Sequence, residues 1–369
     1  MKVLFLTNVP SPYRVKFFNE LGKYCDLTVV FEKKTSTERD ESWKQYSFDS
    51  FKGIVLEGIS VNADTSLCLS VKKFLNSELF DVIVCCNFTS PTGMYAVRYM
   101  KKHRIPYIIE SDGGFAKSGK GFIEKLKYHS IVGANYYLST SKVHDEYYLK
   151  YGAKTEQIVR YPFSSVSDNE ILKMPVCDVE KAKAKKRLGI KENRIVLSVG
   201  QFIHRKGFDL LLQSASSFPK NTGVYIVGGE PTEEYTKMKE QLDLSNVHFV
   251  GFKKPLELAE YYQAADLFAL PTREDIWGLV INEAMAYGLP VVTTDRCLAG
   301  VEMIENDVNG KIVTVDNSLE LAKAIIGLLL DSDMMKRIAL ANLDKSHKYT
   351  IETMVKCHLD FLSNMKRVC

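Results

Sequence analysis

Short apolar runs alternate with longer mixed stretches along most of the chain, and this pattern predicts its secondary structure. The runs lack a strict alternation of apolar and polar residues, which is typical of strands buried on both faces of a parallel sheet. In the first half, the pattern predicts helices at residues 13–24, 66–76 and 91–103. The predicted strands of this half cover residues 3–7, 27–31, 81–86, 107–110, 135–139 and 158–161.

The same alternation starts again after residue 190. Its predicted strands cover residues 194–199, 222–227, 247–250, 266–270, 290–294 and 310–313. The predicted helices cover residues 207–217, 233–242, 256–264 and 319–330, with another ending at residue 285 and a charged helical region at the C-terminus. Between the halves, Pro162, Asp168 and the intervening serines disfavour helix and strand alike.

Strands that alternate with helices predict a parallel sheet in each half. We therefore expect an α/β fold with two Rossmann-like, doubly wound domains that face each other across a cleft. The first domain should cover residues 1–163 and the second residues 170–346. A C-terminal helix at about residues 347–369 is expected to pack back on the first domain, and the lysine-rich residues 181–187 are expected to form a solvated helix face.

Composition narrows the class of protein. With 369 residues, 46% of them hydrophobic and 25% charged, the chain fits a globular protein of two domains. No apolar stretch is long enough for a membrane span, and the eight cysteines form no C-x-x-C pair, so we expect reduced thiols and a cytoplasmic location. A net charge of +4 is too mild to indicate nucleic-acid binding. The histidines lack metal-ligand spacing, so no metal is expected. No cofactor is expected either.

The loops that follow the strands are the expected ligand sites of such domains. After the strand at residues 266–270, Asp275 lies in the loop and Glu283 lies about one turn into the next helix. Gly278 is expected at the start of that helix, where backbone N–H groups and the positive dipole end suit a pyrophosphate. The carboxylates suit the hydroxyls of a sugar and a ribose, because each accepts several hydrogen bonds. The alternative is that both acids are solvated surface charges.

This stretch resembles the E-x7-E region of family-4 retaining glycosyltransferases, and the likeness extends from Glu283 through Val292. The resemblance implies the GT-B fold, a nucleotide-sugar donor, and a donor contact along Trp277, Gly278 and Leu279. It implies that Glu283 holds the ribose hydroxyls and that Asp275 contacts the transferred sugar. The family usually has Glu at the first position, so Asp275 departs from it by one methylene.

A second stretch of the same resemblance follows the strand at residues 194–199. After Gly200, Gln201 stands where the family usually has Arg, and Arg205 precedes Lys206. Arg205 and Lys206 are expected to neutralise the departing diphosphate, since fixed cations stabilise charge that develops in the transition state. Gly228 and Phe252 each follow a strand and are expected to contact the nucleotide, although ordinary turns would explain both positions equally well.

The first half offers weaker signals for the acceptor side. Relatives often have a His-Gly pair where this sequence has Asp112 and Gly113, so Asp112 is expected to orient the acceptor or a sugar hydroxyl. A common Asp-Gly turn is the alternative. Arg14, after the first strand, could reach a phosphate, cap a helix or be a surface charge. Residues 115–129 mix bases and aromatics and could lie on an anionic membrane, or form an ordinary loop and helix.

These patterns together predict an enzyme that transfers a hexose-type sugar from a nucleotide-diphosphate sugar to an acceptor hydroxyl. The resemblance implies retention of the anomeric configuration and an acceptor that is a polysaccharide or lipid-linked saccharide. We also expect the cytoplasmic protein to associate with the inner face of the cytoplasmic membrane. An epimerase on the same fold is one alternative, and a non-catalytic nucleotide-binding subunit is the other. The sequence specifies neither the base and sugar of the donor nor the acceptor and linkage.

Overall fold

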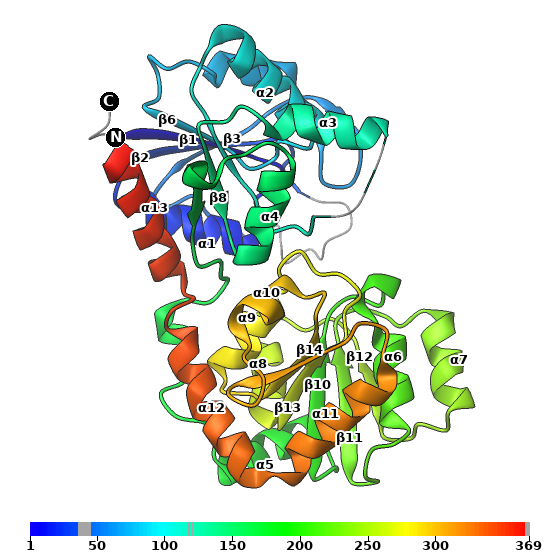
Figure 1. Cartoon of the computed structure of the whole chain (residues 1–369). Coiled ribbons are helices and arrows are strands. Elements are labelled where there is room, and N and C mark those ends of the chain that lie inside the picture. The colour runs from blue at the N-terminus through cyan, green and yellow to red at the C-terminus, as the bar shows by residue number, and fades with distance from the viewer. Residues whose placement is uncertain (36–45, 117–118, 120, 366–369) are drawn as a thin grey trace. The chain divides into compact units, whose positions relative to one another are not determined.

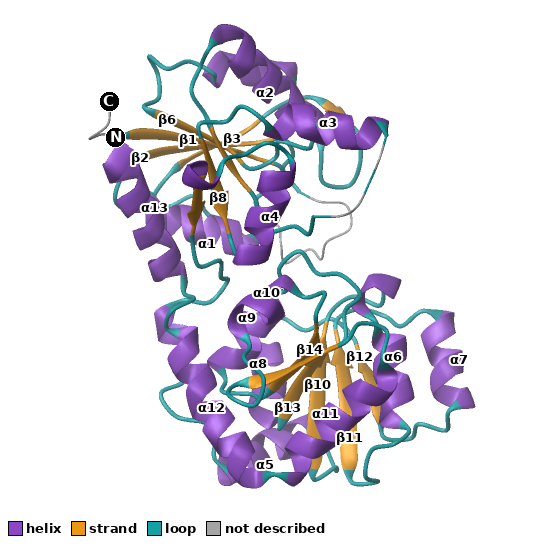
Figure 2. Ribbon diagram, viewed as in Figure 1, coloured by secondary structure: helices purple, strands orange, loops and turns teal. Residues whose placement is uncertain are grey.

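The computed structural model describes residues 1–35, 46–116, 119 and 121–365. The chain divides into two compact units, one of Met1–Ser165 with Thr350–Cys369 and one of Val166–Tyr349. Each unit is built on its own parallel sheet with helices on both sides of it (Figures 1 and 2). The expected α/β class with two Rossmann-like domains is therefore confirmed.

The first unit contains a seven-stranded sheet among its described residues, in the order β3-β2-β1-β6-β7-β8-β9. Its strands, with the small β4-β5 hairpin, are β1 (Lys2–Thr7), β2 (Asp26–Phe31), β3 (Lys52–Val55), β4 (Ile59–Ser60), β5 (Ser66–Leu67), β6 (Val82–Cys85), β7 (Ile108–Glu110), β8 (Tyr136–Ser139) and β9 (Ile158–Arg160). Its helices are α1 (Pro12–Leu21), α2 (Pro91–His103), α3 (Phe122–Ile131), α4 (Lys142–Lys150) and α13 (Ile351–Met365), with 3-10 turns η2 (Leu69–Phe74) and η3 (Thr155–Gln157).

The apolar strands of the first unit form its core. Residues 3–6 of β1 are almost completely buried, because β1 is central and helices cover both faces of the sheet. The C-terminal helix α13 packs against α1 in this unit, as the red and blue helices of Figure 1 show. The ring of its His358 lies against that of Phe17 of α1, with centroids 4.8 Å apart and planes tilted by 58°.

The second unit contains a six-stranded parallel sheet in the order β12-β11-β10-β13-β14-β15. The strands are β10 (Arg194–Val199), β11 (Thr222–Val227), β12 (Val247–Val250), β13 (Leu267–Leu270), β14 (Val291–Thr294) and β15 (Gly310–Val313). The helices are α5 (Asp178–Leu188), α6 (Phe208–Ala215), α7 (Glu233–Gln241), α8 (Pro255–Ala264), α9 (Leu279–Ala286), α10 (Leu298–Met303), α11 (Ser318–Leu330) and α12 (Ser332–Ser346), with 3-10 turns η4 (Asp168–Glu170) and η5 (His204–Lys206).

The strand order of the second unit places two loops side by side. The chain leaves β10 toward β11 on one side, and it later returns to β13 on the other side of β10. The order of strands thus reverses between β10 and β13, and the loops that follow these two strands begin at the same edge of the sheet. Ligands of open parallel sheets bind at such a point.

Two of the expected features are wrong. Residues 66–76 form no α-helix, because Thr92 of α2 accepts a hydrogen bond from Cys68 N and donates one to Ser66 O, which holds the start of the segment extended. The lysine-rich face of α5 is not simply solvated. Lys181 and Lys185 each bind the buried carboxylate of Asp266, at 3.0 and 3.1 Å.

Candidate functional site

The loops after β10 and β13 bring together Arg205, Lys206 and Asp275. The Lys206 Nζ lies 2.5 Å from Asp275 Oδ2, and Arg205 Nη1 lies 3.3 Å from Asp275 Oδ1. Arg205 Nη1 also donates to the carbonyl oxygen of Glu274, at 2.6 Å. In this structure both cations therefore surround the carboxylate that the sequence assigned to the transferred sugar.

The backbone of the β13 loop holds the cation-bearing turn η5 in place. The amide of Arg273 and the hydroxyl of Thr272 both donate to the carbonyl oxygen of Arg205, each at 2.8 Å. Gly207 follows with φ of 68°, and a Cβ there would lie 2.0 Å from the carbonyl oxygen of Pro271. Only glycine permits this close approach, so the sequence Lys206-Gly207 has a steric reason.

Arg273 fixes the same turn from its side chain, a role that the sequence reading missed. Its guanidinium forms a bidentate pair with Asp209 at 2.8 and 2.6 Å, and it donates to the carbonyl oxygen of His204. A second carboxylate, Asp316, lies 2.6 Å from Nε. The hydrogen bonds to Asp209 raise the pKa of Arg273 further above its usual value. Arg273 is a permanently charged residue in the loop directly after β13, and this position was the signal that could have identified it.

Glycines line the edge of the sheet beside these cations. Gly228, with φ of 133°, comes so close to Gly200 that a Cβ would lie 2.5 Å from the Gly200 carbonyl oxygen. Gly200 N in turn donates to Val227 O at 2.9 Å. Phe252, two residues beyond β12, keeps 43% of its surface exposed. An exposed ring and bare backbone at the carboxyl edge of the sheet are suited to a planar ligand.

Backbone hydrogen bonds and a close glycine contact hold the segment from Asp275 to α9. The Asp275 backbone donates to Arg296 O and accepts from Leu298 N, at 2.8 and 3.1 Å. Gly278 caps α9 with φ of 104°, and a Cβ at this position would lie 2.7 Å from the sulfur of Cys297. Burial raises the pKa of Cys297 to about 12, so the thiol packs as a neutral group.

Trp277 and Leu279 flank Gly278 and differ in exposure. The Trp277 indole is buried and donates from Nε1 to Asn282 Oδ1 at 2.8 Å. Because the side chain is buried, only the backbone of Trp277 could contact the donor. Leu279 is half-buried as the first residue of α9.

Glu283 is half-buried on α9 and is bonded by a residue that the sequence reading did not identify. The hydroxyl of Tyr262, on α8, donates to Glu283 Oε2 at 2.9 Å. Tyr262 lies outside the motif that contains Glu283. A tyrosine near the end of a helix is usually a core residue, so nothing in the sequence singled it out.

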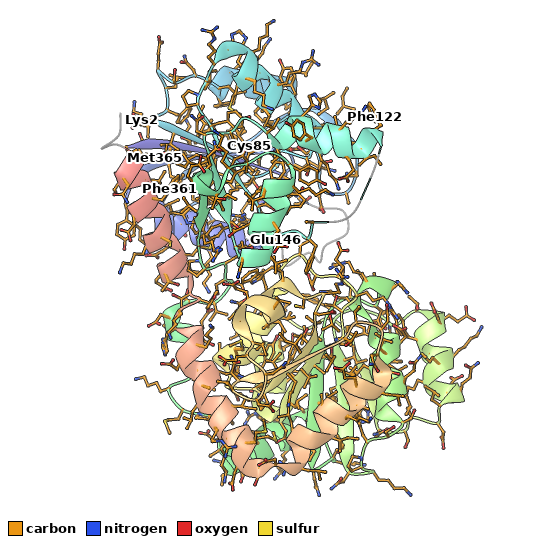
Figure 3. All side chains as sticks on the ribbon, in the orientation of Figure 1. Lys2, Cys85, Phe122, Glu146, Phe361 and Met365 are labelled. Carbon is orange, nitrogen blue, oxygen red and sulfur yellow. The ribbon has the colours of Figure 1, made fainter. Side chains whose placement is uncertain are left out.

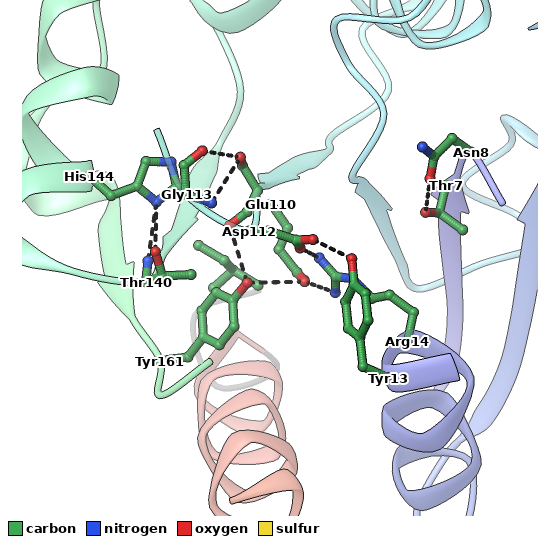
Figure 4. Close-up of polar contacts among 12 residues, drawn as sticks. Thr7, Asn8, Tyr13, Arg14, Glu110, Asp112, Gly113, Thr140, His144 and Tyr161 are labelled. Atoms are coloured by element: carbon green, nitrogen blue, oxygen red, sulfur yellow. Dashed lines mark hydrogen bonds and ion pairs between the residues drawn. The ribbon is translucent and has the colours of Figure 1, made fainter. Parts of the chain in front are cut away.

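A second cluster of charges lies in the first unit, where Arg14, Glu110 and Asp112 meet (Figure 4). The Arg14 Nη1 binds Glu110 Oε1, and Nη2 binds Asp112 Oδ1. The hydroxyl of Tyr13 donates to Asp112 Oδ2 at 2.6 Å. Arg14 is buried, so it is not a surface charge, and both of its terminal nitrogens are engaged by carboxylates rather than offered to a phosphate.

Glu110 is fully buried at the end of β7 and is bound from three directions. Besides Arg14, the hydroxyl of Tyr161 lies 3.3 Å from Oε1, and His358 Nε2 of α13 lies 3.2 Å from Oε2. Burial would raise the pKa of Glu110, but the charge of Arg14 and the bond to His358 outweigh it and lower the pKa to about 2. The carboxylate is therefore ionised, and it links α1, β7 and α13.

Helix α3 presents a surface of apolar and basic side chains. Phe122, at its first turn, is 80% exposed and projects from the unit in Figure 3. Ile123, Leu126 and Tyr128 are also exposed, and Lys125 and Lys127 lie among them. The predicted membrane segment thus has its helical part here, while Lys117, Ser118 and Lys120 fall outside the described residues. In the described part of the chain, no helix has the length and apolar content to cross a membrane.

The second unit matches a known family. Residues 180–342 fit the family model described as glycosyl transferases group 1. This range contains every donor-side residue named above, so it confirms the resemblance to glycosyltransferases that the sequence showed.

Two curated relatives and a solved structure extend the likeness. An uncharacterized glycosyltransferase of Haemophilus influenzae is 30% identical over 179 residues, which are 47% of this chain and 50% of that protein. The N,N'-diacetylbacillosaminyl-diphospho-undecaprenol alpha-1,3-N-acetylgalactosaminyltransferase of Campylobacter jejuni is 25% identical over 278 residues, 72% of each chain. The crystal structure of Anabaena Alr3699/HepE in complex with UDP covers 99% of this chain and 100% of its own, with a TM-score of 0.80 and 20% identity. The chain thus spans about half the length of the Haemophilus relative, and the solved structure supports the fold.

Proposed function

Because residues 180–342 match the family model of glycosyl transferases group 1, we propose that the chain is a retaining, family-4 glycosyltransferase that uses a nucleotide-diphosphate sugar. The observation that carries this proposal is the meeting of Arg205, Lys206 and Asp275 where the strand order reverses, beside the Gly278 start of α9. Cations, bare backbone amides and a helix N-terminus are the groups that bind a diphosphate.

In the proposed reaction, the bond between the sugar C1 and the diphosphate oxygen breaks, and the acceptor oxygen bonds to C1 on the same face. The departing diphosphate takes the acceptor proton, so no side chain acts as a strong base. Arg205 and Lys206 leave Asp275 at least partly and neutralise the diphosphate as its charge grows. Asp275 is then available to the hydroxyls of the transferred sugar, and Glu283 accepts from the ribose.

The acceptor role is assigned to Asp112 in the first unit. Arg14 and Tyr13 hold its two oxygens, which keeps the carboxylate in one orientation. An oriented carboxylate can accept a hydrogen bond from an acceptor or sugar hydroxyl. We propose positioning of that hydroxyl, and not proton removal, as the function of Asp112.

The relatives suggest which substrates to try first. The Anabaena structure holds UDP, and the Campylobacter enzyme is named for a diphospho-undecaprenol acceptor. We propose a UDP-sugar donor and a polysaccharide or lipid-linked saccharide acceptor, at the inner face of the cytoplasmic membrane, with no required metal.

A donor panel tests the proposed activity. Purified protein is incubated with UDP-, GDP- and ADP-sugars, with and without short lipid-linked saccharides, in the presence and absence of EDTA. We expect release of nucleotide that depends on the acceptor and resists EDTA, and a product whose anomeric proton by NMR keeps the donor configuration. An isomerised donor would identify an epimerase, binding without turnover a non-catalytic subunit, and inverted product would overturn the retaining assignment.

We also propose that α3 contacts the membrane surface. Exposed Phe122 and Ile123 can insert at the interface while the exposed Lys125 contacts anionic headgroups; Lys127 is half-buried beside its partner Glu124. Vesicle flotation should show more protein on anionic than on zwitterionic vesicles. Phe122→Ser with Ile123→Ser should abolish the difference, whereas Leu256→Ser, at an equally exposed position of α8, should not. Equal flotation of all three proteins would refute membrane contact by α3.

A further inference from the structure

A buried tyrosine lies behind the carboxylate proposed to hold the ribose. Tyr262 belongs to α8 and Glu283 to α9, and the bond of 2.9 Å between the Tyr262 hydroxyl and Glu283 Oε2 joins these helices. Only 2% of the Tyr262 surface is exposed, while Glu283 is half-buried. The inner side of the carboxylate is therefore bound by protein, and part of Glu283 reaches solvent.

The ring of Tyr262 has little freedom to move. It stacks on Tyr287 with centroids 5.2 Å apart and planes 16° apart, and it lies 6.1 Å from the ring of Phe268 on β13. Burial, and after it the charge of Glu283, raise the pKa of Tyr262 well above its usual value. The hydroxyl consequently stays protonated, and it donates to the carboxylate from a fixed position.

We infer that Tyr262 is a positioning residue for the nucleotide ribose: it holds the Glu283 carboxylate in the one orientation that accepts hydrogen bonds from the ribose hydroxyls. This inference rests on the proposed function, because it assumes that Glu283 meets a ribose. Beyond the proposed function, it assigns to Tyr262 the protein's preference for a nucleotide with ribose hydroxyls over one that lacks them.

The physical reason is the flexibility of glutamate. A glutamate side chain has three rotatable bonds, and freezing them on binding costs conformational entropy. A buried donor that already fixes one oxygen removes part of this cost before the ligand arrives. A carboxylate has about four acceptor positions, so the bond from Tyr262 is compatible with further bonds from a diol.

The experiment compares two probes by calorimetry, UDP and 2',3'-dideoxy-UDP, which differ only in the ribose hydroxyls. The wild-type protein should bind UDP more tightly. Glu283→Ala should bind both probes equally. Tyr262→Phe, which keeps the ring and removes one hydroxyl, should lose about tenfold of the preference for UDP while its affinity for the dideoxy probe stays unchanged.

A matched control separates positioning from packing. Tyr287→Phe removes one hydroxyl from the ring that stacks on Tyr262, and it should leave the preference as in the wild type. A purely structural role of Tyr262 would weaken both probes equally or lower the melting temperature without changing the preference, and either result would overturn the inference. In the double variant Tyr262→Phe with Glu283→Ala, the tyrosine change should have no further effect on the preference.

The two proposals fail in different ways. If the wild type binds neither probe, or if Glu283→Ala keeps the preference, the ribose role in the proposed function is wrong. If Glu283→Ala removes the preference and Tyr262→Phe keeps it, the proposed function stands and Tyr262 has no positioning role.

Discussion

The two charged clusters of this protein contain the same kinds of groups but treat their cations differently. In the first unit, Arg14 is almost completely buried, with both terminal nitrogens on the carboxylates of Glu110 and Asp112. In the second unit, the Arg205 side chain is 44% exposed and shares Asp275 with Lys206. We call the first the closed cluster because its arginine is buried, and the second the open cluster because Arg205 reaches solvent, while Lys206 and Asp275 are 13% and 10% exposed.

The difference in burial implies different roles: the charges of the first cluster fix its geometry, and the cation of the second can move to a ligand. An ion pair buried away from water is strongly destabilised when one partner is lost, so it fixes geometry. The exposed Arg205 contributes little to stability through its pair with Asp275, and it can exchange this carboxylate for a diphosphate at small cost. The closed cluster therefore suits the positioning of Asp112, and the open one suits a ligand whose charge changes during the reaction.

The largest effect is expected from breaking the open cluster. Arg205→Ala with Lys206→Ala removes both cations of the proposed diphosphate site, so turnover should fall by about 10³-fold or more and UDP binding should become undetectable by calorimetry. Lys186→Ala with Arg187→Ala, on the surface of α5, changes the net charge equally and should retain activity. Unchanged UDP affinity in the first variant would refute the phosphate assignment.

Breaking the closed cluster should mainly cost stability. Arg14→Met leaves the buried Glu110 without its cation, and we expect a loss of about 3–5 kcal/mol in the free energy of unfolding, measured by urea denaturation. Arg160→Met removes an exposed partner of Asp145 in the same unit and should cost less than about 1 kcal/mol. If the two variants are equally stable, the first cluster does not hold its unit together.

A smaller effect tests what the closed cluster positions. Asp112→Asn keeps the shape of the side chain and can still accept from Tyr13, but it removes the negative charge. Transfer to the acceptor should fall about tenfold while the affinity for UDP stays constant, since the change weakens one oriented hydrogen bond. An equal fall in both quantities would identify Asp112 as structural.

The sequence predicted the fold well because its main signals are local. Apolar runs such as residues 194–199 and 222–227 became β10 and β11 with the same bounds. The prediction of a helix at residues 66–76 was wrong because the side chain of Thr92, distant in sequence, binds the backbone of that segment. Tertiary hydrogen bonds of this kind leave no trace in a local pattern.

The sequence predicted residues of the candidate site only where a charged side chain lies within a stretch that resembles the family. Arg205, Lys206, Asp275 and Glu283 stood in recognisable stretches, and the strand order explains why the first three meet. Tyr262 and Arg273 act through partners that lie 21 and 64 residues away along the chain, so spacing gave no signal for them. The pairing of Arg14 with Glu110 was missed for the same reason, because 96 residues separate the two.

The smallest effect in this series is the pH dependence of the closed cluster. Glu110 has a pKa lowered from 4.5 to about 2 in the folded protein, so its contribution to stability is complete above pH 4.5 and is lost as the pH falls through about 2. Between pH 7 and pH 4 this loss amounts to about 1 kcal/mol, because only the unfolded chain takes up a proton at this position. Glu110→Gln should remove that part of the slope in the free energy of unfolding against pH. Glu156→Gln, which changes an exposed carboxylate of the same unit, should keep the slope of the wild type. Equal slopes in all three proteins would mean that Arg14 does not hold Glu110 ionised, and the contrast between a closed and an open cluster would then lose its electrostatic basis.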